Sequence, residues 1–314
     1  MRSIRKIFMT GVLCLTLFTT LTISCRERSE TSAQETFTAN HQTAKTRFID
    51  VKGTSFAYRI LGREKGIPLV LIQGLGWGMD NWHPAVTNGL ARKYKLIIFD
   101  NRGVGASKGS TPNTIHAMAD DAIDFIEALH LSKVNIMGYS MGGFIAQRMA
   151  LSRPTLINKM ILIGTGPQGA EGLSDLPNII GGLKGLEPEE FFLKFGFTQS
   201  AASIANGKAS YARIQLRTID RDPLLSDTSS SSQFTAVLNW AKPDANGLSE
   251  LNKIKNPVLI VHGENDLPIP VQNAHNMKQN LDHAELLIFP DSGHSAFFQN
   301  HDEFVAKAVT FLSE

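Results

Sequence analysis

The sequence alternates short apolar runs with amphipathic segments, and this rhythm limits the folds that the chain can adopt. The apolar runs occupy residues 68–72, 95–99, 133–137, 159–163, 257–262 and 285–289. Because these runs are continuous, they are typical of strands that are covered on both faces. Segments with helical spacing lie between or after them, at residues 82–93, 114–130, 141–151, 270–281 and 296–312. This alternation predicts an α/β fold with a mostly parallel, doubly wound sheet.

Two regions depart from the rhythm. Residues 47–51 and 55–61 alternate in the manner of a two-stranded hairpin. Residues 166–247 contain Gly-Gly, Pro and a polar run, with only patches of helical spacing. We therefore expect a helical cap at 166–247, inserted over the carboxyl edge of a core that comprises residues 47–165 and 248–314.

Composition excludes some classes of partner and cofactor. The chain has 314 residues, of which 42% are hydrophobic and 19% charged, as in an ordinary globular protein. A formal net charge of +2 is too small to indicate nucleic acid as a partner. Both cysteines precede residue 26, and no His/Cys cluster has ligand spacing, so we expect no disulfide framework, no metal and no cofactor.

The first 25 residues have the pattern of an export signal. Basic residues precede an apolar run at residues 7–23, and Ser24 and Cys25 lie before an abruptly polar stretch. Residues 21–25 resemble a bacterial lipoprotein cleavage box, although Thr22 stands where such boxes prefer Leu. We expect lipidation at Cys25 and membrane attachment; the alternatives are an uncleaved anchor, or a plain signal on a periplasmic or secreted protein. Residues 26–46 are polar and predict a disordered tether.

A candidate nucleophile lies between a predicted strand and a predicted helix. Residues 138–142 read Gly-Tyr-Ser-Met-Gly. A sharp strand-to-helix turn strains the backbone of the central serine, and glycines are needed on either side because a Cβ there would clash. This context, rather than the motif alone, predicts Ser140 as a catalytic nucleophile.

Two loops downstream can supply the acid and the base that such a serine requires. After a turn of this type, the acid and then the histidine follow along the chain. Asp266 lies in the loop after the strand at 257–262, with Glu264 as the alternative acid. His294 follows the last strand, and it is the one histidine of nine in that position. We predict a triad of Ser140, Asp266 and His294.

Backbone and aromatic groups complete the predicted site. Acyl transfer needs two N–H donors for the oxyanion, which we assign to Met141 and to Leu75, in the glycine-containing loop at 73–76. Trp77, beside this loop, could line the substrate pocket. Trp240, in the cap, could form part of an apolar roof, although cap aromatics often pack among themselves.

Together these motifs resemble the α/β-hydrolase superfamily. The resemblance rests on residues 73–76, 100–107, 138–142, 263–266 and 293–294, and it is closest to enol-lactonases, small-ester hydrolases, cofactor-free haloperoxidases and proline iminopeptidases. Gln73 stands where relatives usually carry His. The resemblance implies a serine hydrolase that forms an acyl-enzyme with a small ester or lactone. An aminopeptidase, a cofactor-free perhydrolase and a non-catalytic exported binding protein stay open, as does the oligomeric state.

Overall fold

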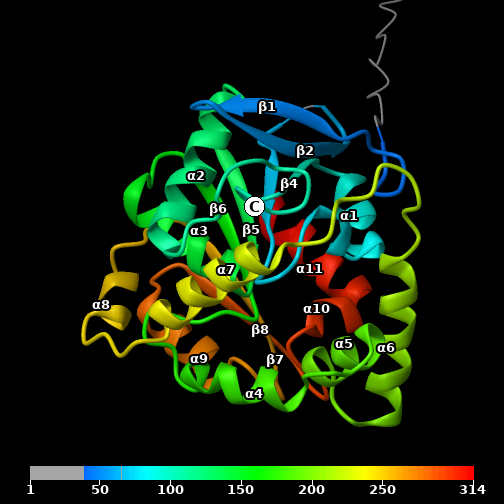
Figure 1. Cartoon of the computed structure of the whole chain (residues 1–314). Coiled ribbons are helices and arrows are strands. Elements are labelled where there is room, and N and C mark those ends of the chain that lie inside the picture. The colour runs from blue at the N-terminus through cyan, green and yellow to red at the C-terminus, as the bar shows by residue number, and fades with distance from the viewer. Residues whose placement is uncertain (1–38, 65) are drawn as a thin grey trace, which may run out of the picture. The chain divides into compact units, whose positions relative to one another are not determined.

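A sheet of eight strands organises the part of the chain that the computed structural model describes, residues 39–64 and 66–314 (Figure 1). The spatial order is β1-β2-β4-β3-β5-β6-β7-β8. The strands are β1 (Arg47–Val51), β2 (Thr54–Gly62), β3 (Leu69–Ile72), β4 (Lys95–Phe99), β5 (Val134–Tyr139), β6 (Ile157–Ile163), β7 (Val258–Gly263) and β8 (Ala284–Phe289). Strand β2 pairs antiparallel with β1 and β4, and the strands from β4 to β8 pair in parallel. The predicted α/β fold is confirmed.

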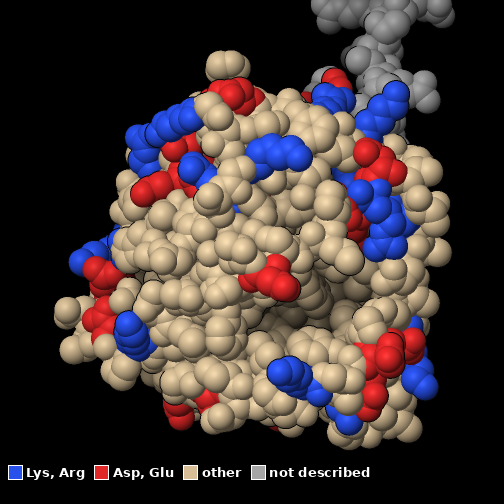
Figure 2. Space-filling model, viewed as in Figure 1, with Lys and Arg blue, Asp and Glu red and all other residues tan. Residues whose placement is uncertain are grey.

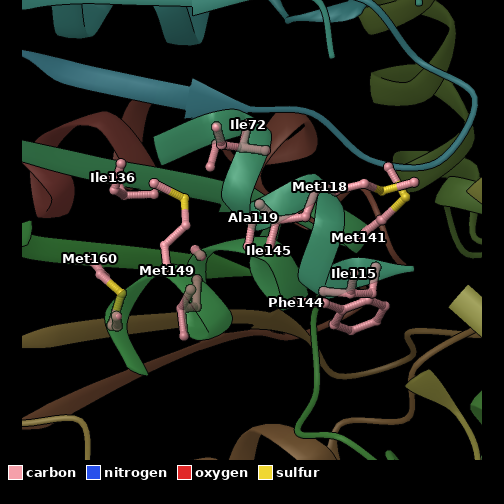
Figure 3. Close-up of a cluster of buried hydrophobic side chains, with 14 of the residues drawn as sticks. Ile72, Ile115, Met118, Ala119, Ile136, Met141, Phe144, Ile145, Met149 and Met160 are labelled. Carbon is pink, nitrogen blue, oxygen red and sulfur yellow. The ribbon is translucent and has the colours of Figure 1, made fainter. Parts of the chain in front are cut away.

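Helices cover both faces of the sheet. One face carries α2 (Ile115–Ala128), α3 (Met141–Ser152) and α9 (Gln272–Asn280); the other carries α1 (Pro84–Ala91), α10 (Ala296–Gln299) and α11 (His301–Ser313). Figure 3 shows part of the first core, where methionines of α3 meet strand residues such as Ile136. Neighbouring strand residues point to opposite faces, so Val70 joins one core and Leu71 the other. Two covered faces explain why the apolar runs are continuous.

The region between β6 and β7 is helical. It contains η2 (Leu173–Asp175), α4 (Leu176–Gly182), α5 (Pro188–Gly196), α6 (Ala201–Ile214), α7 (Asp227–Trp240) and α8 (Gly247–Leu251). Figure 1 shows α4, α5 and α6 together at the end of the fold away from β1 and β2. Helix α8 begins at Gly247, the last residue of the predicted cap, and continues to Leu251. The predicted boundary between cap and core therefore falls at the start of a helix and not in a loop.

The polar segment before β1 corrects one prediction. Residues 39–46, expected to belong to the tether, instead pack on the folded body: His41 and Ala44 are buried. Arg217 donates to the carbonyl oxygens of both residues, each at 2.9 Å, and His41 N donates to Asn88 Oδ1 at 2.7 Å. Side chains that are distant in sequence make the hydrogen bonds of this segment's backbone. The polar composition of the segment gives no sign of these partners.

The predicted signal at residues 1–25, Cys25 and the earlier part of the tether lie outside the described residues. Within residues 39–64 and 66–314, none of the helices combines the length and hydrophobicity that crossing a membrane requires.

Candidate active site

Ser140 sits on a strained turn between β5 and α3. Its backbone has φ 53° and ψ −118°, a conformation that a residue with a side chain rarely adopts. The turn is held because Ser140 N donates to Ile163 O at 2.9 Å and Thr165 Oγ1 donates to Ser140 O at 3.0 Å. A Cβ at Gly142 would lie 2.0 Å from Ile72 O, so glycine is required there. The local sequence therefore presents the serine hydroxyl on a rigid bend.

The structure brings His294 and Asp266 together. His294 Nδ1 lies 2.8 Å from Asp266 Oδ2, and both side chains are buried. Asp266 Oδ1 accepts the N–H of Ile269 at 2.9 Å, which fixes the carboxylate. Because Asp266 engages Nδ1, Nε2 is the ring nitrogen left for proton exchange. Glu264, the alternative acid, is exposed and makes no bond to this imidazole.

Ser140 and His294 line the same cavity. No hydrogen bond joins the serine hydroxyl to the imidazole in the part of the chain that the structure describes. Such contacts are often long in unliganded hydrolases and tighten when substrate binds. The arrangement thus places the nucleophile and its base on the lining of one cavity.

A second histidine, which the sequence pattern does not place in the site, lies against the acid. His262 Nε2 is 2.7 Å from Ile269 O and 3.3 Å from Asp266 Oδ2. A carbonyl oxygen only accepts, so Nε2 carries the proton. Burial lowers the pKa of His262, against the opposing effect of Asp266. We assign this neutral ring to the support of the Asp266 loop; its spacing of four residues before Asp266 is the only sequence signal for it.

Two backbone N–H groups are available to an oxyanion. Within residues 39–64 and 66–314, neither Leu75 N nor Met141 N has a hydrogen-bond acceptor. Met141 opens α3, where helical N–H groups are unpaired and the helix dipole favours negative charge. A Cβ at Gly74 would lie 3.2 Å from Ser140 Cβ, which shows how closely the Leu75 loop approaches the nucleophile.

The cavity has a volume of about 540 Å³ and a mostly apolar lining. Figure 2 shows a hollow on this face, between the cap helices α5 and α7 of Figure 1. The cap contributes Ile180, Phe195 and Phe234, and the core contributes Tyr139 and Phe144. Burial raises the pKa of Tyr139, which keeps its hydroxyl neutral.

The two predicted pocket tryptophans differ in position. Trp77 lines the cavity and stacks on Phe192, with ring centroids 6.0 Å apart. Trp240 is not among the lining residues, contrary to the prediction. It stacks at 5.3 Å on Phe144, which does line the cavity, and its Nε1 donates to Gly166 O at 3.4 Å. Phe144 therefore takes the place that the sequence suggested for Trp240.

Charge at the cavity is sparse. Asp227, an exposed residue at the start of α7, is the one Asp or Glu on the lining, and no Lys or Arg lies there among the described residues. The same residues, 39–64 and 66–314, contain no group of three or more His, Cys, Asp or Glu that could hold a metal ion. The lining favours a substrate that is neutral and largely apolar.

Comparison with known proteins gives a consistent picture. A solved α/β-hydrolase fold protein from Chitinophaga pinensis is 40% identical, with a TM-score of 0.85, and the match covers 87% of this chain and 99% of that one. A 2-hydroxy-6-oxo-6-(2'-aminophenyl)hexa-2,4-dienoic acid hydrolase of Metapseudomonas resinovorans is 27% identical over 85% of this chain and 90% of its own length. A proline iminopeptidase of Pestalotiopsis fici is 26% identical over 85% and 99%, respectively.

Residues 67–301 match the sequence profile of the alpha/beta hydrolase fold. This match covers well over half of the chain, including the turn at Ser140 and the loops of Asp266 and His294. The resemblance stated from the motifs is thereby confirmed: the chain belongs to the α/β-hydrolase fold family.

Proposed function

We propose that this protein is a serine hydrolase that cleaves a small, uncharged carboxylic ester or lactone through an acyl-enzyme on Ser140. One observation carries the proposal: a strained serine and a histidine paired with a buried aspartate line the same apolar cavity, beside two N–H groups that have no acceptor among the described residues. This is the set of groups that two-step acyl transfer requires.

The proposed reaction begins with proton transfer from Ser140 Oγ to His294 Nε2 as Oγ attacks the carbonyl carbon. Leu75 N–H and Met141 N–H stabilise the resulting oxyanion. Collapse of the tetrahedral intermediate breaks the bond to the leaving oxygen, which takes the proton from His294. Water then repeats the sequence on the acyl-enzyme and releases the acid. Asp266 orients the imidazole and stabilises its cationic form throughout.

The cavity lining supports an uncharged substrate. The Metapseudomonas relative is named for a dienoic acid, which bears a carboxylate. Proteins usually bind a carboxylate with Arg or Lys, and neither lines the cavity of this chain in its described residues. The carboxylate of Asp227 would repel such a substrate. A neutral ester or lactone fits this environment better.

Asp227 also supports a second candidate, an aminopeptidase, because a carboxylate at the cavity rim could bind the ammonium group of a peptide. The Pestalotiopsis relative is named a proline iminopeptidase. Comparing turnover of proline p-nitroanilide with that of p-nitrophenyl butyrate separates the two activities. Asp227→Asn should abolish turnover of proline p-nitroanilide and leave turnover of p-nitrophenyl butyrate unchanged.

The deciding experiment is Ser140→Ala. We expect it to abolish turnover of p-nitrophenyl butyrate and labelling by a fluorophosphonate probe, since no nucleophile is left. Ser132→Ala is the control and should retain both, because Ser132 is exposed and its side chain makes no hydrogen bond to the described residues. If Ser140→Ala retains turnover or labelling, the proposed function is wrong.

We further propose that the protein is exported and anchored to a membrane by lipid on Cys25. The motivation is the signal-like sequence pattern of residues 1–25. Labelled palmitate should be incorporated into the wild-type protein, and Cys25→Ala should abolish the label and release the protein from the membrane fraction. Membrane retention of an unlabelled Cys25→Ala protein would instead indicate an uncleaved anchor.

A further inference from the structure

Two glutamine side chains hold the N–H groups on either side of Leu75. Gly74 N donates to Gln73 Oε1 at 3.0 Å, and Gly76 N donates to Gln233 Oε1 at 2.8 Å. Leu75 N, between them, has no acceptor in the described residues. Of these three consecutive donors, the structure leaves unpaired only the one that the proposed reaction needs.

The orientation of both amides follows from chemistry. A backbone N–H requires an acceptor, so each glutamine presents Oε1 to the loop and directs Nε2 elsewhere. Both Nε2 groups are buried and lack a partner within residues 39–64 and 66–314. Buried amides without partners are rare because they are costly, and each calls for an explanation. Holding the loop is a function that explains both.

The loop needs such support because glycine permits many conformations. Gly76 has φ +81°, a left-handed conformation, and no atom lies within 4 Å of the position of a Cβ there. Gly76 has no side chain to restrict its backbone, and a Cβ added there would meet none of the described residues apart from its two chain neighbours. The Gln233 bond supplies the restriction from α7, 157 residues further along the chain. A helix of the cap is thus hydrogen-bonded to a loop of the core.

We propose that Gln73 and Gln233 are positioning residues that fix the oxyanion loop, and that Gln233 makes transition-state stabilisation depend on the docked cap. This inference rests on the proposed acyl-transfer function. Neither side chain lines the cavity. Their effect on the reaction is therefore indirect and acts through the direction of Leu75 N–H.

The test compares Gln233→Met with Gln233→Glu. Methionine has a similar length but no strong acceptor, whereas glutamate retains an acceptor oxygen. We expect Gln233→Met to lower kcat for p-nitrophenyl butyrate by about 10- to 100-fold, somewhat less than the loss of an oxyanion donor, with KM changed by less than about threefold. Gln233→Glu should recover most of this loss.

A second readout separates positioning from general damage. A trifluoromethyl ketone binds serine hydrolases as an oxyanion adduct, so its affinity for Gln233→Met should fall by the same factor as kcat/KM. The affinity for butyramide, which forms no such adduct, should stay unchanged. Gln73→Met should lower kcat and the affinity for the ketone in the same way, provided that a cooperative unfolding transition shows that this variant is folded.

The matched control is Gln299→Met. Gln299 also joins the cap to the core, because its Oε1 accepts from Ser203 Oγ at 2.7 Å and its Nε2 donates to Asp291 O at 2.8 Å. It does not touch the oxyanion loop, so its loss should leave kcat within about twofold. If Gln233→Met keeps wild-type kcat and ketone affinity while Ser140→Ala is inactive, the positioning role is wrong and the hydrolase proposal stands. Turnover by Ser140→Ala would overturn the hydrolase proposal itself.

Discussion

Arg59 Nη2 lies 2.6 Å from Asp222 Oδ1, and both side chains are almost fully buried. Arg59 belongs to β2, whereas Asp222 belongs to the loop between α6 and α7 of the cap. The same guanidinium lies 2.6 Å from Asp80 Oδ1. The two aspartates also bond to each other: Asp80 N donates to Asp222 Oδ2 at 2.9 Å, and Asp222 N donates to Asp80 Oδ2 at 2.7 Å. Asp80 is in η1 (Met79–Asn81), three residues after Trp77. This cluster attaches the cap to the core just beyond the oxyanion loop.

Removing one member of the cluster should be strongly destabilising. Asp222→Ala leaves Arg59 with a single carboxylate and Asp80 N without an acceptor. We expect a loss of about 3 kcal/mol in the free energy of unfolding, measured by urea denaturation, because the buried Arg59 charge loses one of its two carboxylate partners. Asp120→Ala, at an exposed position of α2, should change it by less than about 0.5 kcal/mol. A loss of similar size in both variants would contradict the role of the cluster.

His83 should make stability depend on pH. Burial lowers its pKa from 6.5 to about 3, and neither ring nitrogen has a partner in the described residues. Below pH 6.5 the unfolded chain binds a proton that folded His83 does not bind until about pH 3. Stability therefore falls as the pH drops, by about 2 kcal/mol between pH 7 and pH 5 for this group.

His83→Phe tests this effect. The new ring keeps the tilted contact with the Phe298 ring, whose centroid lies 5.1 Å away, and removes two buried polar atoms. We expect about 1 kcal/mol of added stability at pH 7 and a larger gain at pH 5. His41, also buried with a pKa lowered to about 3, preserves part of the pH dependence. The exposed change His283→Ala is the control, and equal gains for His83→Phe at both pH values would refute the assignment.

Asp266→Asn should disable the reaction without removing the histidine. The Nδ1–H of His294 would meet an amide that can rotate to present its NH2 group, so the favourable tautomer is lost. We expect kcat to fall by about 10³- to 10⁴-fold, as for the acid of other serine triads. Glu264→Gln is the matched control, since Glu264 is exposed and should not affect kcat. If Glu264→Gln lost activity and Asp266→Asn retained it, Glu264 would be the acid of the triad.

The positions of Ser140, Asp266 and His294 could be predicted from sequence because each lies just after a parallel strand. Parallel strands end at one edge of the sheet, so chain position alone brings their loops together. Gln233 and Trp240 could not be assigned in this way. Both lie on α7, and which of its faces meets the oxyanion loop depends on how the cap packs, not on helical spacing.

The packing of residues 39–46 on the folded body could not be predicted from the sequence for a related reason. Its composition is polar, and its order depends on Arg217 and Asn88, which are distant in the chain. Local pattern predicts elements and strand ends well. It does not predict which distant side chain satisfies a given backbone group.

Two glycine-to-alanine changes should have opposite effects. At Gly142 a Cβ would lie 2.0 Å from the backbone oxygen of Ile72, so strand β3 or the Ser140 turn must move. We expect Gly142→Ala to cost more than about 4 kcal/mol or to prevent folding. Gly181, inside α4, has nothing within 4 Å of its Cβ position and no positive φ. Gly181→Ala should therefore stabilise the protein by about 0.5–1 kcal/mol, through higher helix propensity. Thermal unfolding of the two variants measures both effects, and a Gly142→Ala protein as stable and active as the wild type would show that close packing does not fix this turn.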